Sequence, residues 1–189
     1  MEPKQDARPE MNWRQAVEFL VRLADVKNPQ SLKQWELLRL IEECSQFLDL
    51  EGNGQPAREL DQAKTKPATL KPMIEVVSRL VRAVADHTRI EVQVGKTRAV
   101  LDASRLGDER GAVLTDGKLV DVMTAQAVDD LGDAEPWQIS KCLWRDCGRV
   151  FLAERKGQKF CSHRCASASS SAGYQERKRS ESNREVRSG

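Results

Sequence analysis

The stretch "CLWRDCGRVFLAERKGQKFCSHRC", residues 142–165, contains four of the five cysteines in the 189-residue chain. They form two couples, Cys-x4-Cys and Cys-x3-Cys, separated by thirteen residues. Tetrahedral Zn²⁺ is commonly bound by four thiolates that two short loops supply in pairs. The spacing therefore predicts one structural zinc ion, with the ligands Cys142, Cys147, Cys161 and Cys165.

The residues around these cysteines predict a small treble-clef-like unit. Gly148 allows a tight knuckle after Cys147, because glycine lets the backbone turn toward the metal. Residues 149–152 and 158–160 are predicted as two strands joined by a turn at 154–157. Ser162 is a candidate cap for a helix that carries Cys165 in its first turn. So short a segment cannot bury a core of its own, so zinc is expected to contribute folding energy.

Other interpretations of the cysteines remain open at this point. Instead of binding zinc, the four thiols could be free or redox-active, or could be joined in disulfides. His163 lies between Cys161 and Cys165 and is an alternative ligand. Cys44 lies far from the cluster on an apolar helical face, where a buried thiol behaves as a small hydrophobic side chain.

Composition points to a cytoplasmic protein without a membrane span. No apolar run approaches the roughly 20 residues that a span requires. Residues 1–10 are polar and lack an apolar signal core, so they are predicted to be a flexible lead. In a reducing cytosol, paired cysteines are more often metal ligands than structural disulfides.

Residues 11–136 are predicted to form a domain of helices and a small β region. Asn12 with Gln15, and Ser31 with Gln34, are candidate capping boxes for two helices that pack as an antiparallel hairpin. A loop with at most one helical turn is expected over residues 51–72, and a third helix over about 69–87. The apolar face of the second helix is predicted to comprise Leu32, Trp35, Leu38, Ile41 and Cys44. The stripe of the third comprises Met73, Val76, Val77, Leu80, Val81 and Val84.

Beyond residue 89 the pattern changes to short β-rich runs. Residues 90–94 and 97–102 flank Gly95-Lys96, and residues 111–115 and 118–122 flank Asp116-Gly117, so two β-hairpins are predicted. A short helix over 122–133 and an extended segment after Pro136 lead to the cysteines. The predicted fold class is α+β.

The cysteine segment resembles a known bacterial family, the CGNR-type zinc fingers. "CLWRDCGRVF" followed by "FCSHRC" is similar to the family pattern, although "CASA" stands where the family has Cys-Gly-Asn-Arg. In that family the finger follows an N-terminal domain called ABATE. The resemblance implies an ABATE-like domain over 11–136, a four-cysteine finger over 137–175 and a role in DNA binding and transcription regulation.

The C-terminal end is basic, which favours nucleic acid as a partner. Residues 141–189 contain twelve Lys and Arg and five Asp and Glu, a net charge of +7, whereas residues 1–140 carry −5. Such side chains bind phosphates and release counterions. We expect contacts with duplex DNA through Arg149, Arg155, Lys156, Lys159, Arg164, Arg177, Lys178 and Arg179.

Two further predictions concern the tail and the partner. The tail, residues 176–189, is predicted to be basic and disordered. The alternative function is a protein-interaction or scaffold module with a purely structural finger, in contact with a protein partner or a second copy of the chain.

An enzyme is not expected. The sequence "VGKT", residues 94–97, matches the end of a phosphate loop, but Ile90 occupies the position of the required earlier glycine. A catalytic zinc keeps an open position, and four thiols leave none.

Overall fold

The computed structural model describes residues 12–48, 50, 54–95, 97–102, 117–135 and 137–187. The chain divides into two compact units, one up to Pro136 and one from Trp137 onward. The predicted lead, residues 1–10, lies outside the described residues.

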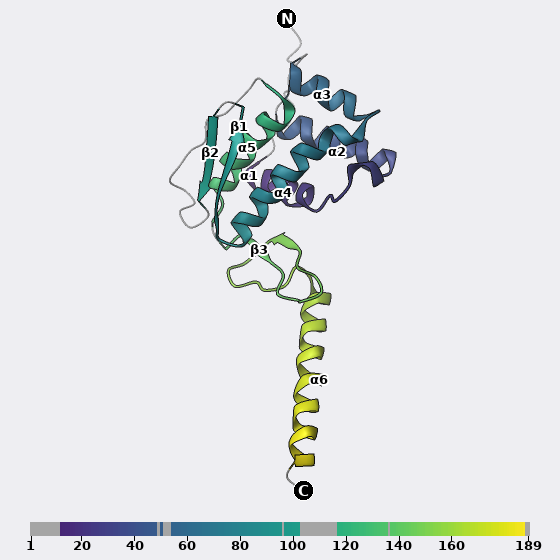
Figure 1. Ribbon diagram of the computed structural model, residues 1–189, viewed down its shortest axis with the longest axis vertical. Helices are drawn as coiled ribbons and strands as arrows, with labels where there is room; N and C mark the ends of the chain where they lie inside the picture. The colour runs from purple at the N-terminus through teal and green to yellow at the C-terminus, as the bar shows by residue number, and fades with distance from the viewer. Residues whose placement is uncertain are drawn as a thin grey trace, which may run out of the picture. The chain divides into compact units, whose positions relative to one another are not determined.

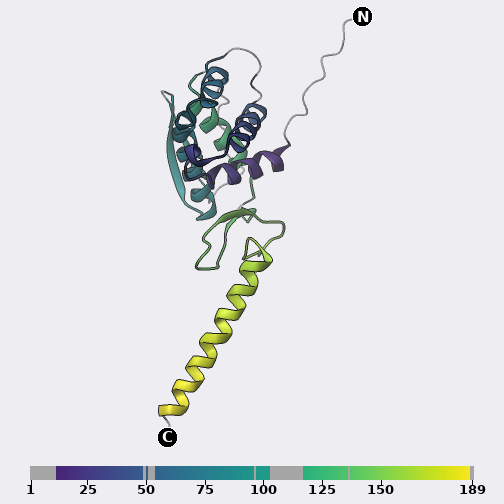
Figure 2. The ribbon, with the colours of Figure 1, turned by 90° about the vertical axis from the view of Figure 1, so that its right-hand side faces the viewer.

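In its described residues, the first unit consists of helices and one β-hairpin (Figure 1). Its helices are α1 (Trp13–Ala24), α2 (Gln34–Phe47), α3 (Gln55–Ala63), α4 (Lys71–Ala85) and α5 (Leu119–Gly132), with short 3₁₀ turns η1 (Pro29–Ser31) and η2 (Pro67–Leu70). Strands β1 (Arg89–Val94) and β2 (Thr97–Asp102) pair antiparallel, with Val94 opposite Thr97. The hairpin forms one side of the unit and the helices lie on the other (Figure 2).

Helix α4 lies at the centre of the core of this unit. It packs against α1, α5 and strand β1. The predicted stripe is confirmed except for the half-buried Val76, since its other five members are buried. Burying each such side chain stabilises the fold by roughly 1.5–3 kcal/mol.

The predicted start of α1 is confirmed. The Asn12 side chain accepts a hydrogen bond from the backbone N–H of Gln15 at 3.0 Å, and the Gln15 side chain accepts from the backbone N–H of Asn12 at 3.0 Å. The indole N–H of Trp13 donates to the backbone oxygen of Asp130 at 3.0 Å, which ties α1 to α5.

The predicted start of α2 is wrong. The helix begins after Lys33, whose backbone N–H donates to the Glu36 carboxylate at 2.8 Å. Ser31 belongs instead to η1, where its hydroxyl donates to the backbone oxygen of Asn28. Helix α1 also packs chiefly on α4 and α5 rather than in a hairpin with α2.

The buried face of α2 also differs from the prediction. Trp35 and Leu38 are 60% and 43% exposed. Helix α2 has more than one apolar stripe, so its periodicity fits two faces and packing decides between them. The buried residues are Leu37, Leu40, Ile41, Cys44 and Phe47.

Two further elements were predicted incorrectly. The expected loop over 51–72 contains helix α3. Pro56 does not prevent this helix, because it stands in the first helical turn, where proline is tolerated. Residues 118–122, predicted as a strand, form the cap and first turn of α5. A short apolar run does not distinguish strand from helix by periodicity alone. The other half of that hairpin, residues 111–115, lies outside the described residues.

The first hairpin, at Gly95-Lys96, is confirmed. Strands β1 and β2 meet at Gly95, which has a φ of 57°. This positive φ explains why a glycine suits the turn.

The second unit contains two short strands and one long helix. Strand β3 (Ile139–Lys141) pairs antiparallel with β4 (Val150–Leu152), with Ser140 opposite Phe151. The predicted partner of β4 was residues 158–160, which form no strand. The strands therefore flank the first cysteine couple instead of following it.

Helix α6 (His163–Arg187) leads away from the loops that carry the cysteines as one continuous helix (Figures 1 and 2). Its backbone is helical through residues 176–187, where a disordered tail was predicted. The described ranges of the chain thus form a mixture of helices and two small antiparallel sheets, which is compatible with the predicted α+β class. In the part of the chain that the structure describes, no helix combines the length and the apolar character needed to cross a bilayer.

Candidate metal centre

The four cysteines of residues 142–165 lie close together in the second unit. The Sγ atoms of Cys142, Cys147, Cys161 and Cys165 all lie within 4.8 Å of one another. The Sγ of Cys161 is 3.6 Å from that of Cys147 and 3.6 Å from that of Cys165. A tetrahedral metal with bonds of about 2.3 Å to sulfur separates its ligands by about 3.8 Å. The cluster can therefore hold one metal ion of that size.

The first couple is positioned by the turn between β3 and β4. Cys142 follows β3 directly, and its backbone N–H donates to the backbone oxygen of Arg149 at 2.8 Å. The N–H of Cys147 donates to the backbone oxygen of Trp144 at 2.9 Å. Gly148 has a φ of 58°, which supports the predicted knuckle.

The second couple lies at the start of α6. The Ser162 hydroxyl accepts a hydrogen bond from the backbone N–H of Cys165 at 3.3 Å, so Ser162 caps the helix as predicted. The backbone N–H of Leu143 donates to the backbone oxygen of Lys159 at 2.9 Å. This bond joins the segment that precedes Cys161 to the first couple.

The hydrophobic core beside the cluster is very small. Cys142, Phe151 and Ala153 are buried, and the other three cysteines are half-buried. Trp137, Trp144 and Phe160 pack against them. So few apolar side chains cannot offset the entropy cost of folding by themselves, so a bound ion would supply a substantial part of the stability.

The thiols of the cluster differ in acidity. Burial raises the pKa of Cys142, but hydrogen bonds from the backbone N–H groups of Cys161 and Trp144 and from neighbouring thiols outweigh it, so the net pKa is lowered. Burial and the three neighbouring thiols raise the pKa of Cys161 to about 12. Four adjacent thiols therefore resist joint ionisation without a cation, whereas a bound metal deprotonates its thiol ligands.

His163, the alternative ligand, and Cys44, the fifth cysteine, lie outside the cluster. His163 is exposed, and its Nδ1 is 3.4 Å from the Ser167 hydroxyl. Cys44 is fully buried in the first unit, as expected, and burial, followed by the charge of Glu43, raises the pKa of its thiol.

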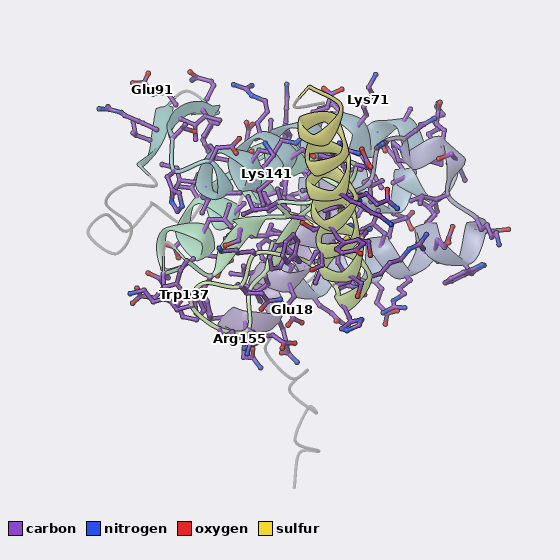
Figure 3. The ribbon with its side chains drawn as sticks, turned by 90° about the horizontal axis from the view of Figure 1, so that it is seen from below. Glu18, Lys71, Glu91, Trp137, Lys141 and Arg155 are labelled. Atoms are coloured by element: carbon purple, nitrogen blue, oxygen red, sulfur yellow. The ribbon has the colours of Figure 1, made fainter. Side chains whose placement is uncertain are left out.

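Six of the eight basic residues proposed from the sequence have exposed side chains in the second unit. Arg155, Lys156 and Lys159 are exposed in the segment between the couples, and Arg149 is exposed just before β4. Arg164 and Lys178 are exposed on α6. Arg177 and Arg179 belong to the same helix, but their side chains are outside the described part. Figure 3 labels two exposed cations of this unit, Arg155 and Lys141, which lie apart in that view.

Sequence reasoning missed an exposed apolar tip on the knuckle. Leu143 is 65% exposed directly beside a metal-ligand candidate. Next to it the Arg145 guanidinium lies 5.6 Å from the centre of the Trp144 ring, a cation–π distance. The only signal in the sequence is an apolar pair placed within the cysteine spacing.

Searches against protein families, curated proteins and solved structures returned no match for this chain. The chemistry of the site therefore rests on its donor atoms and their geometry.

Proposed function

We propose that this chain is a zinc-dependent, DNA-binding regulatory protein of the bacterial cytosol. The observation that carries the proposal is the cluster of four Sγ atoms within 4.8 Å, in a unit whose surface bears exposed cations. Metal binding would fix the knuckle and the start of α6, and the cations would contact phosphates.

Zinc is the metal that this donor set favours. Tetrahedral sites of four thiolates hold Zn²⁺ or iron, and a closed four-cysteine site is the usual structural zinc site. The Sγ separations of 3.6 Å are close to the spacing that Zn²⁺ requires. The Cys-Gly knuckle and the cap at Ser162 are consistent with a divergent treble clef of the CGNR type that follows an ABATE-like domain. This relationship rests on the motif alone.

The charge of the second unit supports a polyanionic partner. Four thiolates and one Zn²⁺ add −2, so the net charge of residues 141–189 falls from +7 to +5 in the metal-bound protein. A positive surface of this kind binds nucleic acid mainly through phosphate contacts, with little sequence information.

A charge-reversal experiment tests DNA binding. The zinc-loaded chain is titrated with duplex DNA at several salt concentrations, alongside the double variant Lys156→Glu, Lys159→Glu. We expect log K to fall linearly with log salt, and the slope to decrease by about 2 in the variant, since two phosphate contacts are lost.

Lys27→Glu with Lys66→Glu is the matched control, because both lysines are exposed in the first unit. It should leave the slope unchanged. Binding that does not respond to salt, or that is equally weakened by both double variants, would contradict the proposal.

A protein-interaction role is the second candidate, and one observation favours it. Leu143 and Tyr174 are 65% and 61% exposed in the second unit, and exposed apolar side chains of this size are frequent at protein interfaces. This candidate predicts a partner whose binding survives the Lys156→Glu, Lys159→Glu change but is lost in Leu143→Ser.

A further inference from the structure

We propose that a groove between α1 and α2 binds a small carboxylic acid that carries one bulky apolar group. The groove belongs to the first unit and shares no residue with the cysteine cluster. The inference therefore goes beyond DNA binding and assigns the protein a ligand.

The groove has an apolar floor and one aromatic wall. It is open to solvent and has a volume of about 220 Å³. Phe19, Leu23 and Leu40 form the buried floor, and the exposed Trp35 lines it as a wall. Sites for drug-sized molecules usually measure 300–1,000 Å³, so this groove suits a single ring system or a short branched chain.

The edge of the groove carries two guanidinium groups that share one acceptor atom. Arg22 Nη1 and Arg39 Nε lie 3.2 Å and 3.1 Å from the same Oε1 of Glu43. The two arginine side chains are 55% and 65% exposed. Among the described residues, neither guanidinium has a second acceptor. Each has five N–H donors, so most of them are available to a ligand.

The other carboxylate beside the groove is already engaged. Glu36 accepts the backbone N–H of Lys33 at 2.8 Å at the start of α2. Its charge therefore lies against the helix N-terminus. Glu43 holds the two guanidinium groups at the mouth of the groove without saturating them.

These features select the chemical class of the ligand. Arginine forks bind carboxylates through paired hydrogen bonds. A single negative charge suits the site better than a phosphate dianion, because Glu43 and Glu36 are close by. The apolar floor and Trp35 require a hydrophobic group next to that charge. A free small acid fits a groove of about 220 Å³ better than an extended or helical peptide segment, which contacts its groove at several successive side chains.

Paired probes test the inference on the full-length, zinc-loaded protein labelled with ¹⁵N. The acid probe is indole-3-propionate and its neutral match is indole-3-propionamide. The indole N–H signal of Trp35, assigned by its loss in Trp35→Phe, is followed by NMR up to 10 mM probe. We expect saturable shifts with the acid and binding at least about tenfold weaker with the amide, because only the acid engages the arginines.

The variant Arg22→Gln, Arg39→Gln should lose the preference for the acid and bind it no more tightly than the amide, because Glu43 then keeps its charge without either arginine. Arg14→Gln, an exposed arginine elsewhere on α1, should keep the preference for the acid. Both arginines of the groove are exposed, so folding should persist, and the unchanged backbone signals of the α4 core would verify it. Equal binding of acid and amide by the natural protein, or no shift of the Trp35 signal with the acid, would overturn the proposal.

A peptide arm separates the free acid from a polypeptide terminus. The probe is acetyl-Ala-Ala-Trp with a free carboxylate. Affinity below that of indole-3-propionate supports a small acid, whereas binding at least tenfold tighter would overturn the assignment in favour of a protein C-terminus.

Discussion

Gly148 and Gly173 are two glycines of the second unit with different backbone requirements. Gly148 has a φ of 58°, in the left-handed region that other residues avoid, whereas Gly173 lies inside α6. No atom would touch an added Cβ at either position within 4 Å. Any difference between the two alanine variants is therefore a backbone effect.

We predict opposite effects for these two substitutions. Gly148→Ala should lower the stability of the metal-bound protein by about 1–2 kcal/mol, the cost of a left-handed conformation. Gly173→Ala should leave it unchanged or raise it by up to about 1 kcal/mol, because alanine is the better helix former. Urea unfolding at saturating zinc measures both, and equal destabilisation by the two variants would contradict the knuckle geometry.

The ligand set predicts a sharp contrast between neighbouring residues. Cys165→Ser should abolish stoichiometric metal binding, since Cys165 belongs to the cluster. His163→Ala should bind one equivalent of zinc as the natural chain does, because His163 is exposed and its ring lies beside Ser167. Elemental analysis of the purified natural chain and of both variants measures how much metal each one binds. Loss of metal in His163→Ala, or iron in place of zinc in the natural chain, would contradict the proposed site.

Asp130 gives the first unit a dependence on pH. Burial raises the pKa of its carboxyl to about 6, and the charges of Asp129 and Asp133 add to the rise, while a hydrogen bond from the Gln126 amide opposes it. The usual value is 3.8. Between about pH 4 and pH 6 the folded state therefore binds more protons than the unfolded state. Folding stability from this group falls as the pH rises through that window.

Asp130→Asn should remove this dependence. At pH 7.5 the variant should be more stable by about 1–2 kcal/mol, a value reduced because the carboxyl is partly exposed. The advantage should vanish as the pH approaches 4. Thermal unfolding of the natural chain and of Asp130→Asn between pH 4.5 and 7.5 measures this difference in stability. Glu75→Gln, at an exposed carboxylate, is the control. An advantage that does not change with pH would contradict the assignment.

At the scale of elements, the two helix starts differ in how directly the sequence specifies them. The start of α1 follows from Asn12 and Gln15, which bond each other's backbones locally. The start of α2 does not follow from Ser31 and Gln34. Asn28 caps the 3₁₀ turn η1, which begins at Pro29 and includes Ser31, so Ser31 does not cap α2. Two nearby capping residues, Asn28 and Ser31, are therefore enough to make the start of a helix ambiguous in the sequence.

Asn12→Ala should destabilise the first unit by about 1 kcal/mol, the usual cost of losing a side-chain cap. Ser31→Ala should change the stability of the first unit by less than about 0.5 kcal/mol, because the hydrogen bond of the Ser31 hydroxyl is exposed and does not cap α2. Chemical unfolding followed by circular dichroism compares the two. A larger loss of stability in Ser31→Ala than in Asn12→Ala would indicate that Ser31 caps α2 and would contradict this assignment.

At the scale of the whole molecule, the two compact units differ in what holds them together. The first unit has a core of many buried aliphatic side chains around α4. Among the described residues of the second unit, the buried ones are Ile139, Cys142, Phe151 and Ala153. The first should therefore be stable without metal, whereas the second should not.

Chelation should unfold the second unit selectively. We expect amide hydrogen exchange in residues 139–165 to rise strongly when zinc is removed, while protection in α4 and α5 remains. Refilling with zinc should restore the protection. Retained protection of 139–165 in the presence of a strong chelator would show that the finger folds without metal.

The sequence by itself determined the features whose causes are local. These are the four-cysteine cluster, the knuckle at Gly148, the caps at Asn12 and Ser162 and the turn at Gly95, because each depends on a few neighbouring residues and their backbone preferences. Tertiary packing decided the rest. Residues 118–122 suit a strand or a helix, and contacts of α5 with α4 and the hairpin select the helix. Helix α2 has two apolar stripes, and packing buries one and leaves Trp35 on the surface beside the arginines, since burial depends on neighbours that are distant in the chain.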